Sequence, residues 1–211
     1  MLFLQAMKSE NSSENSSRRT QLPQEWLDDI RQAVQVMRSG GLVLMPTDTI
    51  WGLACDATNE AAVRKVFAAK QRDDAKALIT LVDKPALVER YVQAVPDAAW
   101  DLMDVADKPL TLVYDDARGL APNLVAEDGS VAIRVTKEPF SRALCGRMAR
   151  AIVSTSANIS GQPAPRCFSE ISDEIKAAAD YICTSRREES GESRPSGIIK
   201  IERGGEVKII R

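Results

Sequence analysis

Short apolar runs, separated by segments with helical periodicity, restrict the fold of this chain more than any other feature. Each run is flanked by polar or turn-forming residues and therefore predicts a buried strand. The runs are LVLM (42–45), ALITLV (77–82), LTLVYD (110–115), VAIRVT (131–136), AIVSTS (151–156) and GIIKIE (197–202). Strands that alternate with helices predict a three-layer α/β domain, in which helices cover both faces of a sheet. A last run, EVKII (206–210), follows two glycines and predicts a closing hairpin, so the sheet should be mixed.

Helical patterns fill the intervals between these runs. Apolar residues recur at helical spacing over residues 26–37, and the glycine pair at 40–41 should end that helix. Asn59 is suited to cap a helix over EAAVRKVFAAK (60–70), which would carry Lys70 at its end. Further helices are predicted over PALVERYVQ (85–93), PFSRALCGRMA (139–149) and SEISDEIKAAA (169–179).

The chain is 211 residues long, which fits one domain with a core of its own. Residues 1–21 are largely polar and rich in Ser, Asn and Glu, which predicts a disordered tail before a single domain over residues 22–211. No apolar run approaches the roughly 20 residues that cross a bilayer. The four cysteines are scattered without a CxxC pair, which favours free thiols and a cytoplasmic location.

Composition removes several kinds of chemistry. The chain contains no histidine, which excludes the Ser-His and Cys-His catalytic pairs and the commonest zinc ligand. The formal net charge is -2, so a site for nucleotides or RNA must come from a local basic patch. Neither a P-loop (GxxxxGKS/T) nor a GxGxxG fingerprint occurs, so neither of these nucleotide-binding motifs is available. Any reaction must therefore rely on lysine, arginine, carboxylates, hydroxyls and bound ions.

Three polar clusters adjoin the ends of predicted strands, where ligands gather in open α/β sheets. They are TDT (47–49), STSANISG (154–161) and SRPSG (193–197). Each cluster alone is typical of a turn or a helix cap. Their shared position at strand ends favours a common binding site.

Basic residues near these clusters have two interpretations. KQR (70–72) ends a predicted helix, where cations compensate the helix dipole. Arg134 lies within VAIRVT on the opposite face from Ile133 and Val135. It lies either on a solvated sheet face or in a cleft, where it would hold a carboxylate or a phosphate. Composition and spacing thus predict an α/β protein with a hydroxyl-lined, basic anion site.

The chain resembles the YrdC/TsaC family of threonylcarbamoyl-adenylate synthases from about Gly40 to Arg211. Five segments carry the resemblance, in family order and with fitting spacing: GGLVLMPTDTIWGLACDA (40–57), KQR (70–72), VAIRVT (131–136), IVSTSANISGQP (152–163) and PSGIIKI (195–201). The resemblance implies an open, twisted mixed sheet of the YrdC/RibB-like type, with flanking helices around a large basic cavity. It also implies the short, single-domain form.

The resemblance implies a reaction of L-threonine, bicarbonate and ATP that yields threonylcarbamoyl-AMP and diphosphate. Downstream proteins would then transfer the threonylcarbamoyl group to adenosine 37 of tRNA. The nucleophile, a carbamate oxygen, belongs to the substrate, so the protein would act by positioning and charge stabilisation and needs no histidine. Mg²⁺ should arrive with ATP rather than in a metal site built by the protein.

By the same resemblance, the site has a threonine part and an ATP part. The threonine-binding residues would be Thr47, Arg134, Ser154 and Ser196. The ATP-binding residues would be Lys70, Arg72, Asp74, Thr111, Ser156, Asn158 and Arg211, with Lys70 and Arg72 as the catalytic pair. Three positions depart from the family pattern: Asp73 replaces a common proline, ADKP (106–109) replaces a Trp-Pro-Gly-Pro run, and Leu81 stands where some relatives have histidine.

Other functions remain open at this point. A module that binds double-stranded RNA or tRNA would use the same basic cavity, although the net charge of -2 and the few aromatic residues disfavour RNA as the main ligand. A YciO-like paralogue with a weaker or different activity would share the fold, but such relatives tend to lose the residues found here at 70, 72, 156 and 158. A scaffold protein gives no account of the three hydroxyl clusters.

Overall fold

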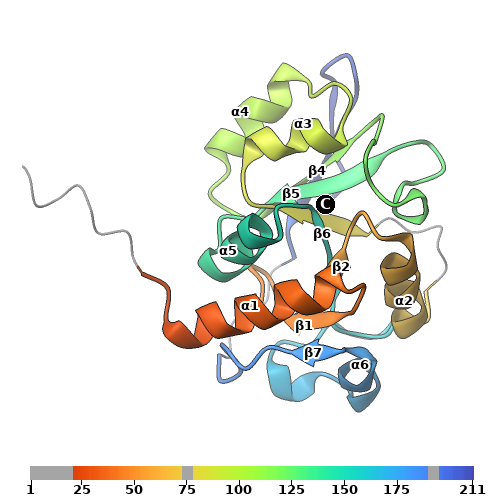
Figure 1. Cartoon of the computed structure of the whole chain (residues 1–211). Coiled ribbons are helices and arrows are strands. Elements are labelled where there is room, and N and C mark those ends of the chain that lie inside the picture. Colours follow the sequence, from red (N-terminus) through yellow and green to blue (C-terminus); the bar gives the residue numbers. More distant parts are fainter. Residues whose placement is uncertain (1–20, 73–77, 190–194) are drawn as a thin grey trace, which may run out of the picture.

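The computed structural model describes residues 21–72, 78–189 and 195–211 (Figure 1). The predicted tail falls almost wholly outside these ranges, as does Asp74, and both stay predictions. None of the helices in the described ranges combines the length and the apolar character needed to cross a membrane.

Nine strands of the described chain form one mixed sheet, in the order β7-β1-β2-β6-β3-β5-β4-β8-β9. The strands are β1 (Val43–Met45), β2 (Gly52–Asp56), β3 (Ile79–Val82), β4 (Leu110–Tyr114), β5 (Val131–Val135), β6 (Ile152–Ser156), β7 (Tyr181–Ile182), β8 (Gly197–Ile201) and β9 (Val207–Ile209). Strand β3 runs parallel to β5, whereas β6 runs antiparallel to both β2 and β3. Because β7 and β9 are separate edges, the sheet is open, as expected.

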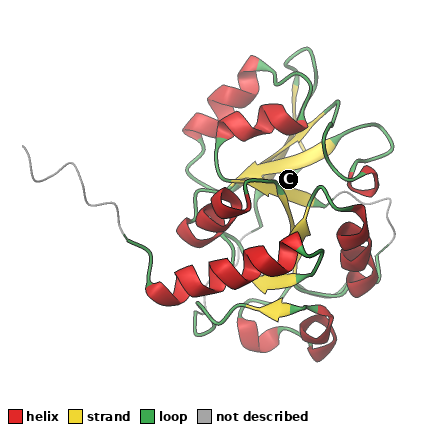
Figure 2. Ribbon diagram, viewed as in Figure 1, coloured by secondary structure: helices red, strands yellow, loops and turns green. Residues whose placement is uncertain are grey.

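Helices cover both faces of this sheet (Figure 2). They are α1 (Gln24–Arg38), α2 (Glu60–Lys70), α3 (Val88–Tyr91), α4 (Asp97–Val105), α5 (Pro139–Met148) and α6 (Asp173–Ala178), with 3-10 turns η1 (Pro85–Leu87), η2 (Pro122–Leu124) and η3 (Phe168–Glu170). Side chains of α2, α3 and α4 join a first hydrophobic cluster with Leu53 of β2. Side chains of α1 and α5 join a second cluster with Ala54 of β2. Consecutive residues of a strand point to opposite faces, so the three-layer prediction is confirmed.

Strand register places three of the predicted site residues on the face of the second cluster. Arg134 of β5 lies opposite Thr111 of β4 and Leu81 of β3. Ser154 of β6 lies opposite Ala54 of β2. Residues opposite one another on paired strands project to the same face. Since Leu81 and Ala54 belong to the second cluster, Arg134, Thr111 and Ser154 share its face of the sheet.

All seven predicted strands are confirmed, but the prediction missed two strands and one helix. The residues after PTDT form β2, which lies between β1 and β6 near one end of the sheet. Its sequence GLACD has only three apolar residues between a glycine and an aspartate, which is too short an apolar run to indicate a strand. Strand β7 has two residues and was too short to recognise. Helix α4 was also missed, although Pro96 precedes its first turn.

Two of the predicted helices are each divided into a 3-10 turn and a shorter α-helix, and a third helix begins where it was predicted. The segment 85–93 forms the turn η1 and then the four-residue helix α3. The segment 169–179 divides into η3 and α6, because Ser172 starts a new helix by accepting a hydrogen bond from Ile175 N at 3.4 Å. Asn59 caps α2 as predicted, since its Oδ1 accepts from Ala62 N at 3.1 Å.

Candidate functional site

A cavity of about 510 Å³ opens beside the central strands, and we refer to it as the first cavity. Seven predicted site residues from separate parts of the chain line it: Thr47, Arg72, Arg134, Ser154, Ser156, Ser196 and Arg211. Strands β2, β6 and β5, which carry or adjoin several of these residues, lie in the middle of the molecule in Figure 1. The fold therefore assembles most of the predicted site around one hollow.

The TDT loop after β1 is held by its first threonine. Thr47 Oγ1 donates to the carbonyl of Ile50 at 2.6 Å and accepts from the backbone N–H of Thr49 at 3.1 Å. Hydroxyl-to-backbone bonds of this kind fix a tight turn. Next to it, a Cβ on Gly52 would come within 2.8 Å of Ser154 Oγ, so glycine lets the loop approach β6 closely. Thr47 thus shapes the cavity wall as well as lining it.

Arg134 is a buried cation in the wall of the first cavity, with 3% of its surface exposed. This overturns the solvated-face interpretation and supports the cleft. Its Nη2 lies 2.8 Å from Asp48 Oδ1. Its Nε is buried and has no hydrogen-bond partner among the described residues. Burial lowers the pKa of Arg134 and the Asp48 carboxylate partly opposes that shift, yet arginine stays charged at any ordinary pH.

Lys70 lies behind the first cavity and does not line it. Its Nζ donates to the carbonyls of Ser156 at 2.5 Å and of Asn158 at 2.7 Å. Its own carbonyl accepts from Ser160 N at 2.9 Å. Burial, and to a smaller extent the neighbouring Arg72, lowers the pKa of Lys70 to about 8. Lys70 thus fixes the turn after β6, while its predicted contact with ATP phosphates stays a prediction.

Asn158 reinforces the same turn. Its Nδ2 donates to the carbonyls of Ile159 at 3.0 Å and of Gln162 at 2.7 Å. Its Oδ1 is buried and accepts no hydrogen bond within the described chain. Buried polar atoms usually have partners, so this oxygen is able to accept a bond from a bound molecule.

The C-terminal strands complete the opposite wall. Thr111 Oγ1 lies 2.9 Å from Ser196 Oγ, and Thr111 is fully buried behind that serine. Arg211 Nε donates to the carbonyl of Ser196 at 3.2 Å, and its backbone pairs with Ile198. The predicted nucleotide residue Thr111 therefore supports Ser196 instead of lining the first cavity, whereas Arg211 is held at its rim.

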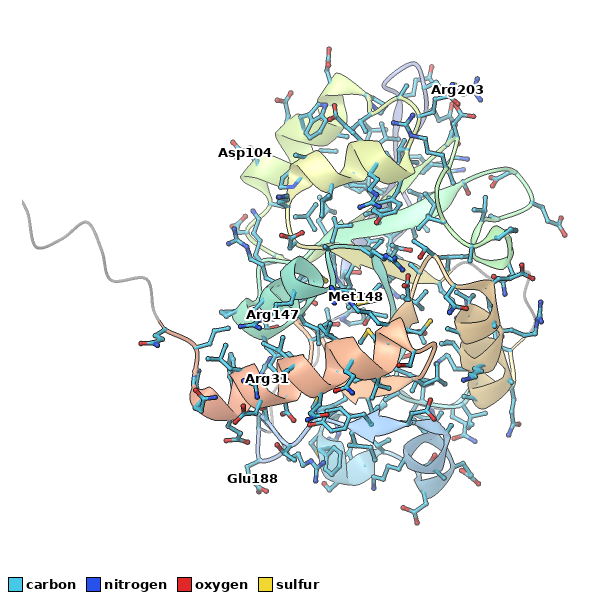
Figure 3. The ribbon with its side chains drawn as sticks, in the orientation of Figure 1. Arg31, Asp104, Arg147, Met148, Glu188 and Arg203 are labelled. Carbon is cyan, nitrogen blue, oxygen red and sulfur yellow. The ribbon has the colours of Figure 1, made fainter. Side chains whose placement is uncertain are left out.

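Four arginines line the first cavity, and no carboxylate does so among the described residues: Arg72, Arg134, Arg166 and Arg211. Arg166 was missed from the sequence, although its place shortly after STSANISG was the available signal. It forms an ion pair with Glu170 at 2.6 Å. Other charged side chains, such as Asp104, Glu188 and Arg203, project from the outer surface (Figure 3). The positive charge of the first cavity is thus local, which suits an anionic ligand.

Metal-binding side chains do not gather in this structure. Across the described ranges, no group of three or more Cys, Asp or Glu residues could hold a metal ion.

A family model named Sua5_yciO_yrdC, described as "Telomere recombination", matches residues 35–211. The chain belongs to this family. Threonylcarbamoyl-AMP synthase from Idiomarina loihiensis is 32% identical over 162 residues, which cover 75% of this chain and 86% of that protein. The match therefore extends over most of the length of this relative.

Solved structures of the Sua5/YciO/YrdC family show the same fold. P. abyssi Sua5 complexed with L-threonine matches with a TM-score of 0.77 and 28% identity, covering 90% of this chain. This chain spans about half of that protein, 55% of its length. E. coli YciO matches with a TM-score of 0.76 over 90% of both chains, and its 22% identity supports likeness of fold alone.

Proposed function

We propose that this chain is an L-threonylcarbamoyladenylate synthase, a nucleotidyltransferase that acts on L-threonine, bicarbonate and ATP. The observation that carries the proposal is the first cavity, where four arginines and several hydroxyls from distant segments converge, and no Asp or Glu side chain of the described residues lines it. The named activity of the relatives and the threonine bound to a family member support the same assignment.

The threonine part of the site would lie around Arg134. The unpartnered Nε of this buried guanidinium suits the carboxylate of an amino acid. Ser154 and Ser196 offer hydroxyls in the same cavity for the polar groups of threonine, and Thr47 holds the adjoining loop. This arrangement would hold the amino acid in one orientation. Binding in a fixed geometry makes a bimolecular step effectively unimolecular and so lowers its entropic barrier.

The reaction we assign balances without a protein nucleophile. The threonine nitrogen attacks the carbon of bicarbonate, and loss of water leaves a carbamate. A carbamate oxygen then attacks the α-phosphorus of ATP, the bond to the β-phosphate oxygen breaks, and diphosphate leaves with that electron pair. Arg72 and Arg211 would stabilise the phosphate charge, together with Ser156 and Asn158 on the turn that Lys70 holds.

Further parts of the proposal concern the surroundings of this reaction. Mg²⁺ would be carried by the triphosphate and would neutralise part of its charge. The product would pass to transfer proteins that modify adenosine 37 of tRNA, and the chain would act in the cytoplasm. Asp74 would complete the nucleotide side. Thr111, which the resemblance also assigns to that side, would support Ser196 of the threonine part through the contact of their hydroxyls.

Threonine-dependent release of diphosphate tests the proposal. The full chain is incubated with threonine, bicarbonate and Mg-ATP, and a pyrophosphatase converts diphosphate to measurable phosphate. Release should need threonine, and Arg134→Met should abolish it, whereas Arg142→Met on the exposed face of α5 should not. Equal release without threonine would indicate a plain ATPase. Salt-sensitive RNA binding without turnover would indicate the RNA-binding alternative.

A further inference from the structure

A second cavity of about 380 Å³ lies on the other side of the TDT loop. Thr47 and Thr49 line both cavities, so the loop forms the wall between them. Of the described residues, Arg134 lines the first cavity and not the second, whereas Asp48 lines the second and not the first. The ion pair of Asp48 with Arg134 therefore crosses the wall.

We propose that Asp48 is a positioning residue, which holds the Arg134 guanidinium from the second cavity so that its remaining donors serve an amino-acid carboxylate in the first. This inference rests on the proposed function, because it assigns a role for Asp48 in binding the threonine substrate. No part of it requires Asp48 to touch a ligand.

The burial of the pair supports this role. The side chain of Arg134 is 4% exposed and that of Asp48 is 11% exposed, so water competes little for their contact. A guanidinium has five N–H donors in a rigid fork. Asp48 approaches it at Nη2, at 2.8 Å, and the buried Nε stays without a partner in the described chain. The contact is an ion pair in which Asp48 Oδ1 has no hydrogen bond, so charge attraction draws the guanidinium toward Asp48 while its other donors stay available for a second carboxylate.

The geometry argues against competition between Asp48 and the substrate for Arg134. A competing carboxylate would have to occupy the cavity that receives the substrate, and Asp48 lines the other one. Glu138, which also lines the second cavity, has its own cation in Arg186 at 2.9 Å and caps α5 through Phe140 N at 2.9 Å. Glu138 therefore does not compete with Asp48 for the Arg134 guanidinium.

Loss of the Asp48 charge should affect one substrate selectively. Without its partner the guanidinium loses a fixed orientation, and binding of the amino-acid carboxylate weakens. The nucleotide residues Arg72 and Ser156 lie on other segments and keep their positions. A purely structural role would instead raise the KM of threonine and of ATP together.

The test compares Asp48→Asn and Asp48→Glu with wild type, and with Asp104→Asn on the exposed surface of α4 as the matched control. Asp48→Asn should raise the threonine KM roughly ten- to a hundredfold, the range expected for one lost charged contact, and leave the ATP KM nearly unchanged. Asp48→Glu keeps the charge and should restore much of the threonine affinity. Calorimetric titration with L-threonine alone, without ATP, provides a second measurement that does not depend on turnover.

The outcomes separate this inference from the proposed function. Wild type that turns over with threonine, together with an Asp48→Asn variant whose threonine KM is unchanged or lower, would overturn the inference and leave the function standing. Equal rises in both KM values would overturn it as well. Wild type that binds threonine without turnover would contradict the synthase, while the titrations still decide the role of Asp48. Wild type that neither binds nor turns over threonine would overturn both.

Discussion

Replacing Lys70 by methionine exchanges a buried ammonium for an apolar side chain of similar length. The carbonyls of Ser156 and Asn158 lose their donor, and each unsatisfied carbonyl costs about 1–3 kcal/mol. Burial of the ammonium charge destabilises folded wild type, whereas the methionine variant has no such charge. The same burial lowers the pKa of Lys70 from 10.5 to about 8. That shift of 10.5 - 8 = 2.5 units corresponds to roughly 3 kcal/mol. Near pH 7 the two effects largely offset one another.

The pH dependence separates the two effects. A lysine whose folded pKa is lowered binds more protons in the unfolded chain between about pH 8 and pH 10.5, so folding stability rises with pH through that window. Methionine has no such dependence. The free energy of unfolding of wild type, minus that of Lys70→Met, should therefore increase by roughly 3 kcal/mol from pH 7.5 to pH 10.5.

Urea denaturation at several pH values measures this difference directly. Lys65→Met on the exposed face of the same helix is the matched control for the exchange of lysine for methionine. Titration of the other groups cancels, because it is common to wild type and variant. A difference that is flat or falls with pH would refute the buried, carbonyl-bonded ammonium on which the reasoning depends.

Three other changes test separate contacts. Arg134→Lys keeps the charge but loses the planar fork, so the threonine KM in the diphosphate assay should rise roughly tenfold or more; an unchanged value would remove Arg134 from the threonine site. Arg72→Met should lower kcat by on the order of a hundredfold, as expected for one lost contact of about 2.7–4 kcal/mol, and a loss below threefold would argue against a phosphate contact. Ser196→Ala leaves the buried Thr111 hydroxyl without its partner and should lower the free energy of unfolding by about 1 kcal/mol in urea; no change would mean that this bond contributes nothing.

The sequence predicts those strands of this fold whose patterns are local. Apolar runs such as LVLM and the alternating VAIRVT were recognised, whereas β2 has only three apolar residues between Gly52 and Asp56 and gave no such pattern. The position of Arg134 shows where local reasoning ends. The side of the strand on which Arg134 lies followed from alternation. Whether that side faces solvent depends on the elements that pack around β5, whose neighbours β3 and β4 come from separate, earlier parts of the chain.

Some features of the candidate site could also be predicted from local sequence, whereas others depend on long-range contacts. The clusters that contain Thr47, Ser154 and Ser196 were found because hydroxyl groups at strand ends are visible in the sequence, and the family resemblance singled out these three residues. The direction of the Lys70 side chain was not, because it depends on carbonyls 86 and 88 residues away along the chain. The pairing of Asp48 with Arg134 is another long-range contact that no local pattern encodes. Sequence therefore supplies the groups of the site, and tertiary structure decides which of them face the first cavity.

The identity of the product tests the central claim most directly. The full chain, supplied with threonine, Mg-ATP and isotopically labelled bicarbonate, is followed by mass spectrometry of the nucleotide products. We predict an adenylate that contains one threonine and one labelled carbon, formed in step with diphosphate. AMP or ADP that carries neither threonine nor the label, at the same rate of ATP consumption, would contradict the assignment.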